Sequence, residues 1–149
     1  AFTFVFALVL LYADKKGSRE RSLRQLTWRD ASYIGLAQAI ALIPGASRSG
    51  VTMSAALLLG YNRKSAAKFS FLLSIPIILG SSMLRSYDLF SLSRASLDLP
   101  ILVYGMVISG FVAYLCIHYF LLLVERFGLL PFVFYRIFLS IVLFSMSLI

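Results

Sequence analysis

Long apolar runs separated by short charged segments most constrain what this chain can fold into. Residues 100–124 contain no Asp, Glu, Lys or Arg, and 60% of all 149 residues are hydrophobic while 13% are charged. A soluble domain has about 45–50% apolar and about 25% charged residues. Because a helix of about 20 apolar residues crosses a bilayer with its backbone hydrogen bonds satisfied, we predict an all-α integral membrane protein.

The positions of these runs divide a single membrane domain, residues 1–149, into segments. The expected segments are a partial transmembrane helix at 1–13, a cytoplasmic basic loop at 14–30, a re-entrant helical hairpin at 31–61, transmembrane helices at 65–85, 100–124 and 129–149, and an extracytoplasmic loop at 86–99. The first run is apolar from residue 1 and has no initiating methionine. We therefore expect that the beginning of this helix lies outside the sequence.

Residues 31–61 can form either one kinked helix or a re-entrant hairpin. The arms 31–43 and 51–61 have 13 and 11 residues. As helices they are about 17–20 Å long, shorter than a hydrocarbon core of about 30 Å. Pro44-Gly45 breaks the helix between them. Both flanking loops are basic, and the hairpin alone returns them to the same, cytoplasmic side, as the positive-inside rule requires.

This topology distributes the Lys and Arg residues unequally across the membrane. Ten lie on the cytoplasmic side, in 14–30, in 63–68 and at Arg126, and two, Arg85 and Arg94, lie opposite. Juxtamembrane basic loops of this kind contact anionic lipids. The net charge of +8 is therefore explained without a nucleic acid partner.

Arg48 lies at the centre of the motif PGASRSG, residues 44–50, between the two arms of the hairpin. An arginine at membrane depth costs a few kcal/mol and should face a polar cavity and have a partner. The apolar segments contain no Asp or Glu, so we predict that an external anion is the partner. Phosphate suits a guanidinium, which binds two of its oxygens in a fork.

The neighbours of this arginine also suit phosphate. Gly45 and Gly50 allow the backbone to approach closely, and Ser47 and Ser49 supply hydroxyls. A helix beginning near Ser49 directs its free N–H groups and positive end toward the same place. Either serine could serve only as a helix cap, but the combination with arginine favours an anion site.

Other residues in the apolar runs give weaker signals. His118 is expected to bond a neighbouring helix rather than act as a base. Arg136 is expected to be structural, binding a lipid headgroup, a carbonyl or Glu125. The single cysteine, Cys116, cannot form an intramolecular disulfide. No phosphate-loop or H-E-x-x-H motif is present.

The stretch QAIALIPGASRSGVTMSAALLLG, followed by RKSAAKFSFLLSIPIILG and later by FVFYRI, closely resembles the C-terminal half of the undecaprenyl-diphosphate phosphatase family, also known for bacitracin resistance. The resemblance covers nearly the whole chain. It implies a multi-pass hydrolase of the bacterial inner membrane that converts undecaprenyl diphosphate to the monophosphate carrier used in peptidoglycan synthesis. It also implies the second half of an inverted-repeat architecture, with the site where two re-entrant hairpins meet.

The resemblance assigns roles residue by residue. Arg48 and Ser47 are the expected catalytic residues, with Arg48 clamping the diphosphate and stabilising charge on the transferred phosphoryl group. The expected phosphate-binding residues are Gly45, Ser49, Gly50 and Thr52.

The glutamate-rich motif of the family has no counterpart in this sequence. The resemblance places that motif in the N-terminal half, where its carboxylates would hold a metal or activate the nucleophile. We therefore expect a divalent cation, Mg²⁺ or Ca²⁺, with ligands outside this chain and no metal ligand within it. These 149 residues alone should supply half of a site and should not hydrolyse the substrate.

The expected partners are an isoprenoid lipid diphosphate and membrane lipids, and a homodimer stays open. Two other functions also stay open. Broken helices equally suit a transporter or flippase of a phosphorylated lipid or small anion. A membrane scaffold without an active site would need Arg48 only for folding.

Arg48→Ala in the complete membrane protein is expected to abolish phosphate release without preventing membrane insertion. Loss of such a charge-stabilising donor costs about 3–4 kcal/mol of transition-state stabilisation. Arg48→Lys should also release phosphate slowly, because the compact ammonium group of lysine cannot bind two phosphate oxygens as the guanidinium does. Near-normal turnover of either variant, measured as phosphate released from the lipid diphosphate, would contradict the assignment.

Overall fold

The computed structural model describes residues 2–18, 20–43, 45–92 and 99–146. These residues form six α-helices and two short 3-10 turns, and no strand is present among them; the elements in order are α1 (Phe2–Lys16), η1 (Leu23–Gln25), α2 (Trp28–Ala39), η2 (Ile40–Leu42), α3 (Arg48–Leu58), α4 (Arg63–Leu92), α5 (Leu99–Phe127) and α6 (Leu130–Met146). The prediction of an all-α fold is confirmed.

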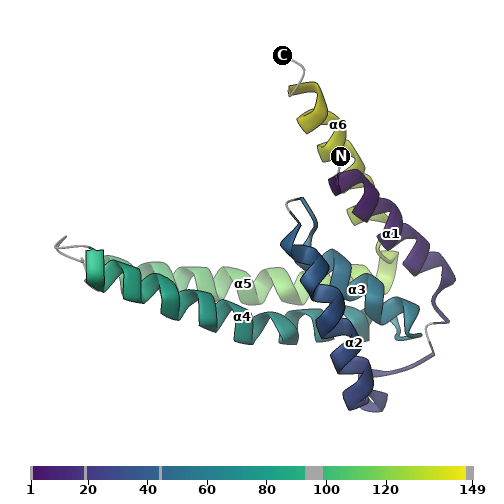
Figure 1. Ribbon diagram of the computed structural model, residues 1–149, viewed down its shortest axis with the longest axis horizontal. Helices are drawn as coiled ribbons and strands as arrows, with labels where there is room; N and C mark the ends of the chain where they lie inside the picture. The colour runs from purple at the N-terminus through teal and green to yellow at the C-terminus, as the bar shows by residue number, and fades with distance from the viewer. Residues whose placement is uncertain (1, 19, 44, 93–98, 147–149) are drawn as a thin grey trace.

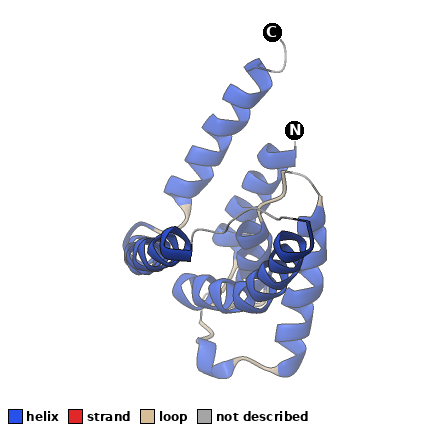
Figure 2. Cartoon of the chain, turned by 90° about the vertical axis from the view of Figure 1, so that its left-hand side faces the viewer, coloured by secondary structure: helices blue, strands red, loops and turns tan. Residues whose placement is uncertain are grey.

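The helices form two pairs that meet around α3. Figure 1 shows α4 and α5 side by side as a long pair that projects from one side, and α1 beside α6 on the other. The shorter helices α2 and α3 lie where the pairs meet, and the second view shows α6 diverging from α5 (Figure 2). The connection between α5 and α6 is a tight turn in which Gly128 has a φ of +73°. This arrangement leaves most of α4, α5 and α6 exposed.

The helix α3 is the most buried element of the fold. It packs against α1, α2 and α4, and seven of its eleven residues are buried. Leu57 and Ala56 of α3 join the main hydrophobic cluster with Leu10 of α1 and Val133 of α6. The backbone after α1 lies close to the end of α3, because a Cβ on Gly17 would lie 2.5 Å from the Leu57 carbonyl oxygen. The position of α3 is therefore set from several sides.

The helices α2 and α3 form a helix–break–helix unit. They pack against each other, and in the segment between them Gly45 has a φ of +88°, a conformation that favours glycine. Their 12 and 11 residues correspond to about 18 and 17 Å. Insertion of this unit into a membrane as a re-entrant hairpin stays a prediction.

Both arms of this unit begin earlier than the expected residues 31 and 51, because each has a capping residue upstream. Thr27 caps α2 by accepting a hydrogen bond from the Asp30 amide, and Asp30 completes a capping box. Ser47 caps α3 by accepting from the Gly50 amide. The first arm also ends early, because α2 passes into the 3-10 turn 40–42.

Two helices in the described part of the chain are long and apolar enough to cross a membrane. They cover Arg63–Tyr87 and Pro100–Phe127, close to the expected spans 65–85 and 100–124. The apolar part of α6, Leu130–Ser145, is shorter. Helix α4 continues to Leu92, so it extends into the loop expected at 86–99.

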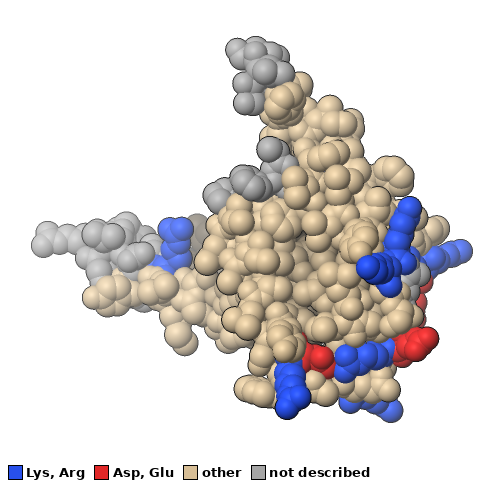
Figure 3. All heavy atoms as spheres, turned by 45° about the vertical axis from the view of Figure 1, so that its right-hand side comes forward, with Lys and Arg blue, Asp and Glu red and all other residues tan. Residues whose placement is uncertain are grey.

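Ion pairs gather the charged ends of the helices at one end of the molecule. Arg63 at the start of α4 holds Asp14 of α1 in a fork, with Nε–Oδ1 at 2.6 Å and Nη2–Oδ2 at 2.7 Å. Lys64 pairs with Glu125 near the end of α5 at 2.6 Å. Figure 3 shows this gathering, with lysines and arginines around the few acidic residues. Arg85 lies about 33 Å further along α4 than Arg63, close to the thickness of a hydrocarbon core.

Asp30 is the centre of a second polar network at the same end. Its Oδ2 atom accepts hydrogen bonds from Arg21, Thr27 and Tyr61, each at 2.7 Å. These donors hold the pKa of the Asp30 carboxyl well below its usual value. Tyr61 is buried, and Arg21 also donates to the Leu59 carbonyl. The network therefore ties the start of α2 to the end of α3.

Asp30→Asn is expected to lower the melting temperature in detergent at pH 7. The free energy of unfolding should fall by about 2 kcal/mol, because hydrogen bonds to a charged group are lost. The folded pKa lies below the unfolded value of about 3.9. The stabilisation is therefore complete above that pH and is lost as the pH falls through the lower folded value. Wild-type stability should therefore begin to fall near pH 4 and keep falling at lower pH, and the variant should show a flatter profile.

Glu20→Gln is the matched control for this measurement, because Glu20 is an exposed carboxylate in the same polar segment. It should leave both the melting temperature and its pH profile unchanged. An Asp30→Asn profile that coincides with the wild type would show that the network does not hold the fold.

Candidate functional site

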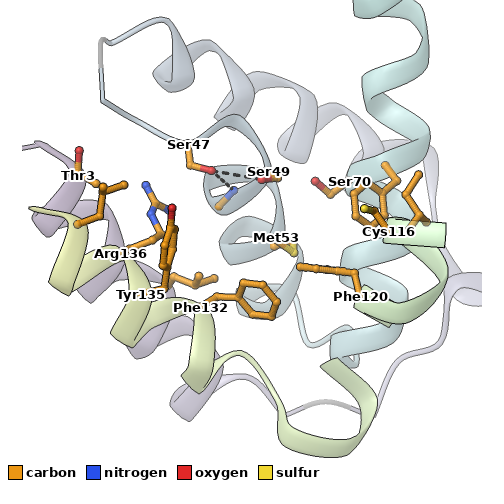
Figure 4. Close-up of a pocket in the computed structure, with 15 residues that line it drawn as sticks. Thr3, Ser47, Ser49, Met53, Ser70, Cys116, Phe120, Phe132, Tyr135 and Arg136 are labelled. Atoms are coloured by element: carbon orange, nitrogen blue, oxygen red, sulfur yellow. Dashed lines mark hydrogen bonds between the residues drawn. The ribbon is translucent and has the colours of Figure 1, made fainter. Parts of the chain in front are cut away.

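A cavity of about 500 Å³ opens beside the beginning of α3. Figure 4 shows its lining residues, which come from α1, α3, α4, α5 and α6. Its polar groups include Ser47, Ser49, Ser70 and Arg136, and the remainder of the wall is largely apolar. The cavity therefore combines a small polar end with a hydrocarbon-like wall.

The polar end is built by the first turn of α3. The Ser47 hydroxyl accepts from the Gly50 amide at 3.2 Å and lies 3.2 Å from the Ser49 hydroxyl. Ser47 is thus the helix cap, the more modest of the two roles considered for it. Both hydroxyls also line the cavity, so the cap and a ligand contact are compatible. The amides at this helix end attract anions.

Arg136 of α6 points toward the same turn (Figure 4). A Cβ added to Gly50 would lie 2.5 Å from Arg136 Nη1, so the absence of a side chain at residue 50 makes room for the guanidinium. Arg136 is half-buried and, among the described residues, its side chain has no hydrogen bond or ion pair. Glu125, one of its expected partners, is bonded to Lys64. A cation free to bind a ligand therefore faces the serine pair.

Arg48, the expected clamp, does not line this cavity. It is half-buried at the first position of α3, and its guanidinium has no partner among the described residues. Successive residues are about 100° apart around a helix, so Ser49, Gly50 and Met53 present a face that differs from the Arg48 face. The role of Arg48 as a phosphate clamp stays a prediction.

Thr52 and Gly45 also lie away from the cavity wall. Thr52 is buried, and its hydroxyl bonds the Arg48 and Ser49 carbonyls and the Ser70 hydroxyl, the last at 2.6 Å. Gly45 is exposed in the bend before α3. The structure therefore brings Ser47, Ser49 and Gly50 together at the cavity and uses Thr52 to support the first turn of α3. The expected phosphate contacts of Gly45 and Thr52 are not tested by this arrangement.

Aromatic side chains form the apolar wall opposite the serines. The rings of Phe71 and Phe120 pack edge to face at 5.4 Å, and the rings of Phe120 and Phe132 lie 4.7 Å apart. These phenylalanines belong to α4, α5 and α6. They join three separate helices into one surface beside the polar end.

The described residues do not form a metal site. No group of three or more His, Cys, Asp or Glu side chains is close enough among them to hold an ion, and the lining of the cavity contains no carboxylate. His118 is exposed, beside the rings of Tyr114 and Tyr119. The expected Mg²⁺ or Ca²⁺, with ligands from outside this chain, stays a prediction.

Sequence reasoning gave Arg136 a structural role, whereas the structure places it at the cavity. Arg136 is 88 positions from Arg48 in the sequence, so the sequence did not show that it lies close to the first turn of α3. This closeness depends on the packing of α6 beside α1. One signal was present: it is the only charged residue in 129–149, and an ionisable residue inside an apolar segment is a functional candidate by default.

Comparison with known proteins gives consistent matches over almost the whole chain. The family described as bacitracin resistance protein BacA matches residues 1–142. A relative from Alteromonas mediterranea, named undecaprenyl-diphosphatase, is 53% identical over 141 residues, which are 95% of this chain and 53% of the relative. A relative of the same name from Nitrosococcus oceani is 50% identical over 142 residues, with the same coverage. The chain spans about half the length of these curated relatives.

Proposed function

Because this chain belongs to the bacitracin resistance protein BacA family, we propose that it forms part of a membrane phosphatase that hydrolyses undecaprenyl diphosphate. The products are undecaprenyl phosphate and inorganic phosphate, and the former is the lipid carrier reused in peptidoglycan synthesis. The names of the two relatives support this substrate. Removal of the diphosphate form also accounts for resistance to bacitracin, the property that gives the family its name.

The observation that carries this proposal is the cavity with two chemically different ends. A lipid diphosphate needs hydrogen-bond donors and positive charge at one end and an apolar surface beside it. Ser47, Ser49, the start of α3 and Arg136 supply the first, and the phenylalanine wall supplies the second. A soluble phosphate ester would have no use for that wall.

The reaction transfers the terminal phosphoryl group to an oxygen nucleophile. A bond forms from that oxygen to the terminal phosphorus, and the bond to the bridging oxygen breaks, so the bridging oxygen stays with the lipid phosphate. Negative charge grows on the bridging and terminal oxygens, and positioned donors stabilise it. We assign this role to Arg136 and the α3 amides in the cavity, with Arg48 and Ser47 as the catalytic residues implied by the family.

The remaining parts of the site lie outside this chain in our proposal. The cavity lining contains no carboxylate that could activate a nucleophile. We place the acidic residues and the divalent cation in the part of the protein that corresponds to the other half of the relatives. That part would also supply the first of the two inverted repeats, with a hairpin that meets the α2–α3 unit.

The same proposal places the protein in the bacterial inner membrane. The charged end, which contains the ion pairs of Arg21, Arg63 and Lys64, faces the cytoplasm, since Lys and Arg concentrate there. The α2–α3 unit then enters and leaves from that side. A homodimer is compatible with this arrangement, because most of α4 and α5 is exposed.

A chimera tests the activity directly. The 141 matched residues of the Alteromonas relative are replaced by the corresponding residues of this chain, and the product is reconstituted into vesicles with undecaprenyl diphosphate. Release of inorganic phosphate is the expected result, and this chain alone should release none. Movement of the lipid across the bilayer without phosphate release would instead support a transporter and would overturn the phosphatase.

Gly50→Ala in this chimera is expected to lower kcat/KM at least tenfold. The new methyl group would occupy the space of Arg136 Nη1 and push that flexible guanidinium away from the serines, while the fold remains intact. Arg136→Gln should have a similar effect, and the double variant should be no worse than either alone. These are the expectations for two changes that remove one interaction.

Gly80→Ala is the matched control, because a Cβ at residue 80 of α4 would meet no atom within 4 Å. It should keep wild-type turnover. Equal turnover of the Gly50→Ala and Gly80→Ala chimeras would show that Arg136 has no role in catalysis.

A further inference from the structure

A second apolar cavity adjoins the candidate site. It has a volume of about 460 Å³ and lies between α4, α5 and the segment around Leu23. Phe71 and Ile117 line both this cavity and the cavity at the start of α3. The two cavities thus share a wall to which Phe71 and Ile117 contribute.

The lining of the second cavity is almost entirely hydrocarbon. From Phe71 it continues along α4 through Leu72 and Ile75 to Ile78, and Leu121 faces it from α5. The hydroxyl of Ser74, which also lines it, donates to the Phe71 carbonyl at 2.6 Å and so needs no polar ligand. Lys68 lies at the cytoplasmic end, where a long side chain can extend its amine to the interface.

We infer that the second cavity holds the isoprenoid tail of the substrate, which passes from the site between Phe71 and Ile117 and follows α4 toward Ile78. This inference rests on the proposed function, because the diphosphate must occupy the polar end of the first cavity. An undecaprenyl chain has eleven isoprene units, and one cavity of about 500 Å³ beside the headgroup cannot enclose it. The second cavity, called the groove below, is the space into which the tail can continue.

The groove selects by shape rather than by removal from water. Outside the groove the tail would lie in the lipid bilayer, whose interior is as apolar as a leucine side chain. The hydrophobic effect therefore contributes little to binding of the tail, and its affinity depends on van der Waals packing. The leucine and isoleucine side chains present an irregular surface that suits the methyl branches of an isoprenoid. Filling the groove should therefore penalise a long tail and leave a short one unaffected.

The test compares two substrates of the chimera in detergent micelles: undecaprenyl diphosphate and farnesyl diphosphate, which has only three isoprene units. Ile75→Trp and Ile78→Trp place an indole in the groove but not in the first cavity. Each should raise KM for the long substrate about tenfold, the usual effect of a misfit in an apolar pocket. KM for farnesyl diphosphate and kcat for both substrates should change less than twofold.

Leu79→Trp is the matched control, since Leu79 is an exposed residue of the same helix and lines neither cavity. It should change neither KM. Equal effects on both substrates, equal effects of all three tryptophans, or no effect of any would overturn the tail route. Ile75→Ala, which cannot block the groove, provides a second variant if a tryptophan prevents folding, and should alter only the long-substrate KM.

The wild-type chimera separates this inference from the proposed function. Hydrolysis of both substrates with an unchanged KM ratio in the variants refutes the tail route alone. No hydrolysis of either substrate refutes the phosphatase. In that case a benzophenone-tagged undecaprenyl diphosphate still tests the groove, because crosslinks at 72–78 would support it and crosslinks elsewhere would overturn it.

Discussion

The structure depends on the burial of helix α3, which is half-buried at its first residues and buried at most positions from Gly50 to Leu57. Helix α3 follows the turn at Gly45, and α1, α2 and α4 pack around it. A helix leaves its first amides without partners inside the helix, so they must be satisfied by a cap or a ligand. Ser47 satisfies one amide, that of Gly50, at 3.2 Å. The cavity lies beside this turn, so the packing that holds α3 also creates a place for an anion.

Polar networks at the opposite end hold the frame around that helix. Arg63 and Asp14 join α4 to α1, and the Asp30 network joins α2 to the end of α3. The carboxylates of these two networks are engaged within the protein. Arg48 and Arg136 have no such partners among the residues that the structure describes. The ion pairs thus engage Arg21, Arg63 and Lys64 at the charged end, whereas Arg48 and Arg136 near α3 are the cations that we propose for binding a lipid diphosphate.

Prediction from sequence succeeded where the cause is local. Apolar run lengths gave the two long helices, and Gly45, in the break expected before α3, has a φ of +88°. Pro44 lies outside the described residues. Ser47 and Gly50 both line the cavity, and their role in binding an anion stays a prediction. Boundaries were less accurate, because Thr27 and Ser47 cap their helices several residues upstream of the apolar arms. The motif could not show that the Thr52 hydroxyl contacts the Ser70 hydroxyl of another helix, and the expected phosphate contact of Thr52 stays a prediction.

The sequence by itself determined an all-helical chain with two helices long and apolar enough to cross a membrane, because run length acts over short distances. From charge bias and helix-breaking residues it also predicted a broken helix pair and an Arg/Ser anion motif. Only the tertiary structure decided which guanidinium faces the cavity. Arg48 is adjacent to both serines in sequence but lies on another face of α3, whereas Arg136 reaches them because α6 packs beside α1. The same packing set Phe71 and Ile117 between two cavities. Such relations depend on helix rotation and on contacts between distant segments, and the periodicity of a single helix does not contain them.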